Sequence, residues 1–164
     1  MGLWVGRDRK ARRCYGFDEI ALVPGNSTVN PNEVDTSWQL GKKRYKVPIL
    51  AAAMDGVVDV NFVVGMSKLG GIAVLNLDGV QTRYDNPEEI LKKISKASPQ
   101  EATKLVQSLY TKPVKEKLIT KRIKEIKSKN ATAAVSTIPQ NAEKYGKLAQ
   151  DAGADVFVVQ STVI

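Results

Sequence analysis

Apolar, β-branched runs alternate with amphipathic helical stretches from residue 47 to the end of the chain. The last run, residues 154–159, reads Ala-Asp-Val-Phe-Val-Val and gives way to Gln160, Ser161 and Thr162. An apolar run of this kind is typical of a parallel strand that is buried on both faces. Small polar residues at the carboxyl end of such a strand are where α/β proteins place ligand contacts. We therefore expect a ligand-binding edge at this end of the sheet.

Four strands joined by helices are predicted in this part of the chain. The strands are expected over residues 47–54, 72–77, 131–136 and 154–159. Asp59 is the expected cap of a helix that ends at Gly70-Gly71. Three helices are expected between the second and third strands, and one more runs from Pro139 to Gly153. Strands that alternate with helices imply a parallel sheet with right-handed crossovers.

Four consecutive βα units fit either half of an eightfold barrel or a small doubly wound sheet. No Gly-x-Gly-x-x-Gly follows a predicted strand and no Walker-type phosphate loop is present, which disfavours the doubly wound alternative. We therefore expect the α/β class, with the N-terminal half of a TIM (β/α)8 barrel over residues 47–164. An irregular N-terminal arm over residues 1–46 is expected to pack on the barrel and to contain a short hairpin around Gly41-Lys42.

The residue types present exclude several kinds of chemistry. The sequence has no histidine and a single cysteine, Cys14. Because histidine is the usual general base and the commonest metal ligand, no metal site is expected. A lone cysteine cannot form an internal disulfide, which agrees with a cytoplasmic protein. No apolar run approaches the ~20 residues of a membrane helix and the start lacks a secretory signal, so no membrane partner is expected.

A formal net charge of +8 makes nucleic acid a partner to consider. Much of the positive charge lies over residues 115–129, where apolar residues recur at helical spacing. Aromatic residues make up only 6% of the chain, and none interleaves with the basic residues as a base-stacking surface requires. We interpret this stretch as the solvated face of a helix and expect no nucleic-acid partner.

Several motifs resemble the IMP dehydrogenase and GMP reductase family. Residues 15–24, Tyr-Gly-Phe-Asp-Glu-Ile-Ala-Leu-Val-Pro, are similar to the run that precedes the barrel in that family. Residues 47–55, Val-Pro-Ile-Leu-Ala-Ala-Ala-Met-Asp, resemble its first-strand motif, and residues 68–72 resemble the entry to its second strand. Relatives usually carry a pair of CBS modules after the second strand. The insert over residues 78–130 is instead short and helical. Residues 55–58, 75–77, 81–84, 109–110 and 112–115 resemble the CBS-less IMP dehydrogenase-like branch (the third GuaB type), found mainly in bacteria.

The resemblance implies a purine-nucleotide oxidoreductase of GMP biosynthesis that transfers a hydride at purine C2. Either IMP is oxidised to XMP with NAD, or GMP is reductively deaminated to IMP with NADPH. In the family a loop cysteine attacks purine C2. That loop is expected beyond Ile164, so no catalytic residue is assigned and these 164 residues alone are expected to be inactive. Family barrels are usually tetramers, which implies a homo-oligomer.

The same resemblance places binding residues on the predicted strand ends. Ala52 and Met54 fall on nucleotide-binding positions, and the cofactor-binding positions are Thr137, Gln160, Ser161 and Thr162. Gln160 stands where the family has an acidic residue that accepts hydrogen bonds from ribose hydroxyls. This departure leaves open a non-catalytic, purine-nucleotide-binding regulatory module on the same scaffold. From the residues alone, Asn76 and Asp78 fit ligand orientation and turn chemistry equally well.

Overall fold

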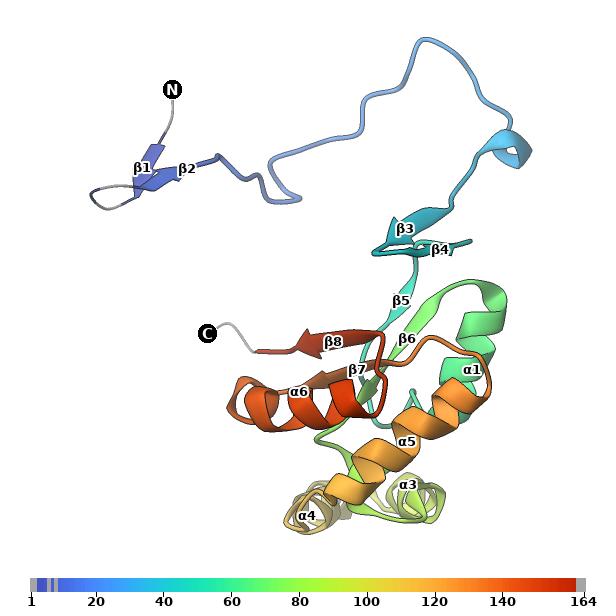
Figure 1. The fold of residues 1–164 in the computed structure, drawn as a ribbon, viewed down its shortest axis with the longest axis vertical. Coiled ribbons are helices and arrows are strands. Elements are labelled where there is room, and N and C mark those ends of the chain that lie inside the picture. Colours follow the sequence, from blue (N-terminus) through green and yellow to red (C-terminus); the bar gives the residue numbers. More distant parts are fainter. Residues whose placement is uncertain (1–2, 6, 8, 162–164) are drawn as a thin grey trace. The chain divides into compact units, whose positions relative to one another are not determined.

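The computed structural model describes residues 3–5, 7 and 9–161, and the chain divides into two units. In the first unit, Met1–Asp35, strand β1 (Leu3–Val5) pairs antiparallel with β2 (Arg9–Ala11). A 3-10 turn, η1 (Pro31–Glu33), follows Asn30, whose side chain accepts a hydrogen bond from the Asn32 amide. The second unit, Thr36–Ile164, contains the main sheet and its helices (Figure 1). The packing of the arm on the barrel stays a prediction.

A parallel sheet of four strands is the centre of the second unit. Its strands lie in the same order in space as along the chain, namely β5 (Leu50–Ala51), β6 (Ile72–Asn76), β7 (Ala134–Thr137) and β8 (Val156–Val159). The register pairs Leu50 with Ile72, and Ala134 with both Val74 and Val156. In a doubly wound sheet the strand order reverses at a switch point, whereas here each strand lies beside the next.

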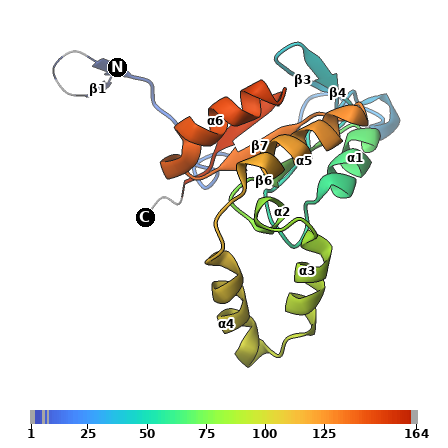
Figure 2. The same cartoon turned by 60° about the horizontal axis from the view of Figure 1, so that its bottom comes forward.

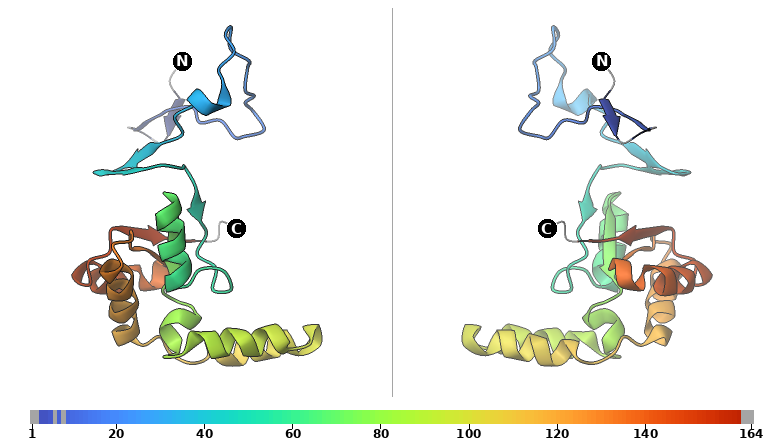
Figure 3. Two further views of the ribbon diagram at one scale, coloured as in Figure 1. Left: turned by 90° about the vertical axis from the view of Figure 1, so that its right-hand side faces the viewer. Right: turned by 90° about the vertical axis from the view of Figure 1, so that its left-hand side faces the viewer.

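Three helices cover one face of this sheet: α1 (Val60–Leu69), α5 (Glu116–Ser128) and α6 (Ala142–Asp151) (Figures 1 and 3). Because strand side chains alternate between faces, Leu75 and Val135 point to the helices and pack against Ile123 in one buried cluster. Consecutive parallel strands with their crossover helices on one side are the arrangement of a β/α barrel. The predicted fold class, the first βα units of a TIM barrel, is confirmed.

The ends of α1 follow the signals in the sequence. The Asp59 carboxylate accepts a hydrogen bond of 2.7 Å from the Phe62 amide, which satisfies a free N–H of the first turn. Gly70 ends the helix in the left-handed region at φ 88°. A side chain there would also collide with Lys46, because an added Cβ would lie 2.6 Å from the Lys46 Cβ.

The first strand is shorter than predicted. The expected strand over residues 47–54 ends at Ala51, after two paired residues. The Met54 amide turns back to donate to the carbonyl of Ala52 at 2.8 Å, and the Val58 amide donates to the Met54 carbonyl at 2.8 Å. These local hydrogen bonds replace the ladder, so residues 52–58 leave the sheet and form a turn at the carboxyl end of β5.

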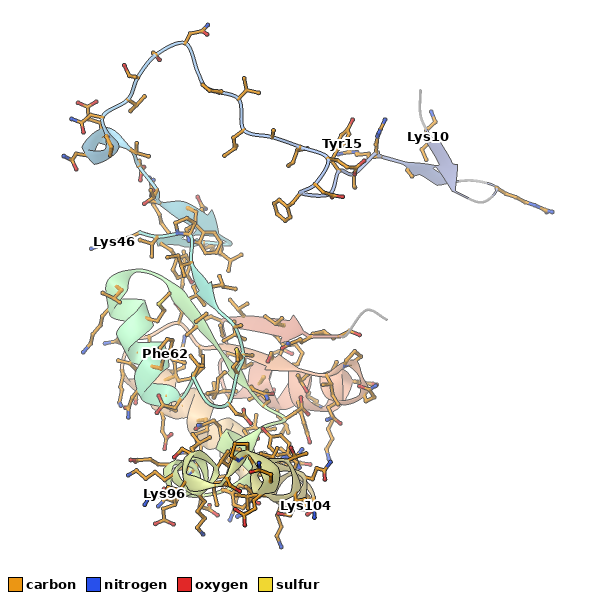
Figure 4. All side chains as sticks on the ribbon, turned by 180° about the vertical axis from the view of Figure 1, so that it is seen from behind. Lys10, Tyr15, Lys46, Phe62, Lys96 and Lys104 are labelled. Carbon is orange, nitrogen blue, oxygen red and sulfur yellow. The ribbon has the colours of Figure 1, made fainter. Side chains whose placement is uncertain are left out.

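Residues 78–130, the expected helical insert, contain the three predicted helices, α3 (Pro87–Lys96), α4 (Pro99–Tyr110) and α5, and a short helix that was not predicted, α2 (Val80–Arg83). Helices α3 and α4 run side by side away from the sheet (Figure 2), and Lys96 and Lys104 extend from them (Figure 4). The two ends of this pair are held together, because the Tyr84 hydroxyl donates to the Leu109 carbonyl at 2.8 Å. The insert therefore leaves the sheet edge and returns to it at the same place.

The predicted hairpin around Gly41-Lys42 is confirmed as β3 (Trp38–Leu40) paired with β4 (Lys43–Tyr45). It groups with the sheet in the second unit. Tyr45 packs on the face of the sheet opposite the helices, against Ile72 and Ala134, and its hydroxyl lies 3.2 Å from that of Thr132. The hairpin thus covers the amino ends of the strands and leaves their carboxyl ends as the open edge.

Candidate functional site

A cavity of about 340 Å³ lies at the carboxyl ends of the strands. We call this edge, with the loops that follow the strands, the rim. The cavity is lined by residues from the ends of β6, β7 and β8, from the turn after β5 and from the insert: Ala53, Asn76, Asp78, Arg83, Tyr110, Ser136, Thr137, Ile138 and Gln160. A larger cavity of about 440 Å³ lies among α1, α3 and α5. Ligands of parallel α/β proteins bind at the carboxyl strand ends, so the rim cavity is the candidate site.

Asp78 joins the loops after β6 and β7. One oxygen of its carboxylate accepts hydrogen bonds from the Thr137 hydroxyl at 2.7 Å and the Ile138 amide at 2.9 Å. The other accepts from the side-chain amide of Asn141 at 2.6 Å. The Asp78 amide itself donates to the Asn76 side chain at 2.9 Å. Asp78 therefore fixes the cavity wall.

Asp55 joins the turn after β5 to the insert. Its carboxylate accepts hydrogen bonds from Asn76 at 3.2 Å and from the Val80 amide at 2.8 Å. It also accepts from the hydroxyl of Tyr110, which lies 55 residues further along the chain. Burial, and then the hydrogen bond and negative charge of Asp55, raise the pKa of Tyr110, while Arg83 opposes the shift. At neutral pH Tyr110 is thus an uncharged donor.

Arg83 brings a positive charge to the rim. Its Nε donates to the carbonyl of Asp78 at 2.8 Å, and its Nη1 donates to the carbonyls of Tyr110 and Lys112. Its guanidinium carbon lies 5.3 Å from the centre of the Tyr110 ring. Within the part of the chain that the structure describes, Arg83 forms no ion pair with a carboxylate.

Two neutral polar side chains complete the cavity. Ser136 is only 1% exposed, and among residues 9–161 its hydroxyl makes no hydrogen bond. Gln160 follows β8, where its main-chain amide donates to the Thr137 carbonyl at 2.9 Å and its side chain is exposed. The groups that remain available to a ligand are therefore the Ser136 hydroxyl, the side-chain amide of Gln160 and Nη2 of Arg83.

The structure brings together some of the residues predicted for the site. Thr137 and Gln160 line the cavity. Ala52 and Met54 lie in the turn after β5, both exposed, and it is their neighbour Ala53 that lines the cavity. Ser161 is exposed directly after Gln160, and Thr162 lies outside the described residues. Ligand contacts at these positions stay predictions.

Sequence reasoning missed Arg83 and Tyr110 as site residues. Arg83 ends a four-residue helix whose preceding residues, Val80, Gln81 and Thr82, are all buried. Tyr110 ends α4 and reaches the rim only because the insert folds back. The one available signal was a charged residue a few positions after a buried strand, which also fits an ordinary helix end.

Four consecutive parallel strands, joined by helices on one face and with polar side chains gathered at the carboxyl rim, define a β/α-barrel protein with its site at that rim. The chain belongs to the IMP dehydrogenase/GMP reductase family, whose domain model matches residues 14–163.

Individual relatives agree with this assignment. An uncharacterized oxidoreductase of Mycolicibacterium smegmatis is 32% identical over 98% of this chain and 44% of its own length. The inosine-5'-monophosphate dehydrogenase of Escherichia coli is 29% identical over 84% of this chain and 27% of its own. The crystal structure of an IMP dehydrogenase/GMP reductase-like protein from Corynebacterium glutamicum matches 99% of this chain and 45% of that chain, with 29% identity and a TM-score of 0.82. The chain thus spans less than half the length of these relatives.

Two further features of the described residues concern membrane helices and metal ligands. Among the described residues, no helix combines the length and the hydrophobicity that crossing a membrane requires. In that same part of the chain, no group of three or more His, Cys, Asp or Glu side chains is arranged to hold a metal ion.

Proposed function

We propose that this chain is part of a purine-nucleotide oxidoreductase that transfers a hydride at purine C2 with NAD or NADP. Either IMP and water become XMP while NAD is reduced to NADH, or GMP is reduced by NADPH to IMP and its amino group leaves as ammonia. Membership of the family supports the class of reaction. The single observation that carries the proposal is the cavity at the carboxyl rim, lined by Thr137 and Gln160.

The polar groups of the cavity fit a nicotinamide cofactor, because Ser136 lines it and its hydroxyl makes no hydrogen bond among the described residues, so it is available to a carboxamide or a ribose hydroxyl. Thr137, Gln160 and Ser161 would hold the cofactor, which when bound accepts or supplies the hydride. The Thr137 hydroxyl already donates its proton to Asp78, so it can only accept a hydrogen bond from a ligand. Gln160 offers both a donor and an acceptor without charge.

The purine nucleotide would lie against the turn after β5. Met54 is 58% exposed there and offers an adaptable apolar surface to a flat purine ring, while the small side chain of Ala52 allows close approach. Cys14 belongs to the N-terminal unit and matches no catalytic motif of the family, so we assign the reacting thiol to polypeptide outside these 164 residues. Assembly as a homotetramer, a cytoplasmic location, a role in GMP biosynthesis and membership of the CBS-less branch are part of the same proposal.

The test is an activity assay of the full-length gene product. The protein is given IMP and NAD in one assay and GMP and NADPH in the other, and the change in NADH or NADPH absorbance measures turnover. The proposal predicts turnover of one pair. Turnover of neither pair, by folded protein at saturating substrates, would leave only the fold.

A regulatory module that binds purine nucleotides without turnover is the second candidate. The observation that favours it is Gln160, an uncharged residue at the rim where the family pattern has an acidic one. Calorimetric titration with IMP, GMP and XMP separates the two functions, because a regulatory module binds a nucleotide but leaves it unchanged in the presence of NAD or NADPH.

A further inference from the structure

The cavity of about 440 Å³ among α1, α3 and α5, which we call the helix cavity, is separate from the rim. Helix α2 contributes one residue to each of the two cavities, because Gln81 lines the helix cavity and Arg83 lines the rim cavity. Residues two apart in a helix point in nearly opposite directions. The helix cavity therefore lies on the other side of α2 from the candidate cofactor site.

The side-chain amide of Gln81 has no partner in the part of the chain that the structure describes. Gln81 is 2% exposed, and its Nε2 is the only side-chain nitrogen or oxygen among the described residues that is buried without a hydrogen bond. No described residue donates to its Oε1. Its main chain, in contrast, is held, since its carbonyl accepts from Nε of Arg122 at 3.0 Å. An unsatisfied buried amide is destabilising, so this position favours a ligand that completes its hydrogen bonds.

The Gln81 amide defines which chemical group fits it. A glutamine side chain presents an N–H donor beside a C=O acceptor. Its complement is a group with the same pair in the opposite order, such as the N–H and C=O of a ring lactam or of a carboxamide. Glutamine side chains bind the edges of nucleobases by two hydrogen bonds of this kind.

The charges around the helix cavity are already compensated. Three of the carboxylates that line it form ion pairs and the fourth caps α1, the pairs being Glu125 with Arg122, Glu88 with Lys92, Asp85 with Lys115, and Asp59 with the Phe62 amide. The lysine that lines the cavity, Lys129, is exposed, so water solvates its charge. Because no buried charge is left for an ionic ligand, the cavity favours a neutral one.

Part of the wall of the helix cavity is apolar. Val60 at the start of α1 and Pro87 and Leu91 of α3 line it, which gives a flat ring a surface to pack on. The volume of the cavity is in the range of small-molecule sites. We propose that the helix cavity binds a neutral ring compound with an amide edge, such as a nucleoside or an aromatic carboxamide, and that Gln81 binds that edge through two hydrogen bonds.

The experiment is isothermal titration calorimetry of the full-length gene product with two probes, uridine and benzamide. Uridine presents the amide edge within its ring, and benzamide presents it as a carboxamide. Saturable binding of at least one probe is expected. Its methylated form, 3-methyluridine or N,N-dimethylbenzamide, has lost the N–H donor and is expected to bind about tenfold more weakly. If the native protein binds neither probe saturably, the proposal is wrong and the cavity holds only solvent.

Two variants locate the bound probe. Gln81→Leu removes an unsatisfied buried amide, so without a probe it is expected to melt no lower than the native protein, while the Kd of the probe rises about tenfold or more. Leu91→Trp places a large side chain in the helix cavity from α3 without changing α2, and it is expected to weaken binding at least as much. An unchanged Kd in either folded variant overturns the proposal.

Gln160→Ala is the matched control, because it removes a glutamine amide from the rim cavity instead. The Kd of the probe is expected to stay within about twofold of the native value. A loss of affinity equal to that in Gln81→Leu would show that the probe binds at the rim and would overturn the proposal. Neither NAD nor a purine nucleotide takes part in the titration, so its outcome is independent of the turnover assay.

Discussion

Gly79→Ala is expected to destabilise the protein through a collision with Asp55. An added Cβ at Gly79 would lie 1.9 Å and 2.1 Å from the two carboxylate oxygens of Asp55. The backbone at Gly79, φ −100° and ψ −161°, is extended and open to any residue, so the cost is steric and not conformational. Real Cβ contacts are essentially never closer than 3.0 Å, so the carboxylate must move by about 1 Å.

That movement breaks the hydrogen bonds that Asp55 accepts from the Val80 amide at 2.8 Å and from Asn76 at 3.2 Å. At about 1.5 kcal/mol for each hydrogen bond to a charged group, the loss is about 3 kcal/mol of unfolding free energy. Urea denaturation followed by circular dichroism measures it. In an Asp55→Ala background the collision partner is gone, so Gly79→Ala is expected to cost less than about 0.5 kcal/mol.

Gly65→Ala is the control for the general effect of adding a methyl group. Gly65 is exposed in the interior of α1, and an added Cβ meets nothing within 4 Å. Its replacement is expected to stabilise the protein by about 0.5–1 kcal/mol. Two results would show that Asp55 is not held where the structure places it. One is that Gly79→Ala leaves the unfolding free energy of the native protein unchanged, and the other is that it lowers this free energy equally with and without Asp55→Ala.

Three further outcomes are expected. Burial raises the pKa of Asp155, but hydrogen bonds from Lys127 and Lys43 outweigh it, so its pKa lies below the ordinary 3.8. A lowered pKa stabilises the folded protein above pH 3.8, and this stabilisation is lost as the pH falls through the pKa of the folded state. In a series of urea denaturations at decreasing pH, the midpoint should therefore fall less steeply in acid for Asp155→Asn than for the native protein. Ile123→Ala should cost about 2–5 kcal/mol in urea denaturation, because Ile123 is fully buried between α5 and the sheet. Tyr110→Phe should remove one tyrosine from the fraction whose ultraviolet absorbance titrates well above pH 10; a loss from the fraction that titrates near pH 10 would mean that Tyr110 is solvated.

The architecture was predictable because its signals are local. Asp59 and Gly70 mark the ends of α1 through cap geometry, and the apolar runs that became β6 and β8 are long enough to identify as buried strands. The choice between a barrel and a doubly wound sheet depends on strand order in space. Missing phosphate motifs only disfavoured one alternative, whereas the consecutive order of β5 to β8 decided it.

The site was predictable only in part, because most of its geometry is non-local. Thr137 and Gln160 follow strands directly, so their place at the rim follows from the parallel sheet. The hydrogen bond between Tyr110 and Asp55, which lie 55 residues apart in the sequence, depends instead on the insert folding back. No periodicity in the sequence encodes this. The counter-ion of Arg83 cannot be judged from sequence either, since a lone charge and a paired one look the same there.

A crystal structure of the gene product in full with IMP and NAD bound shows directly where each ligand lies. We expect the nicotinamide end of the dinucleotide in the rim cavity, within hydrogen-bonding distance of Ser136 and Gln160, and the purine ring against Met54. Dinucleotide density at another place on the protein, with the rim cavity filled only by solvent at saturating NAD, would show that this rim is not the cofactor site.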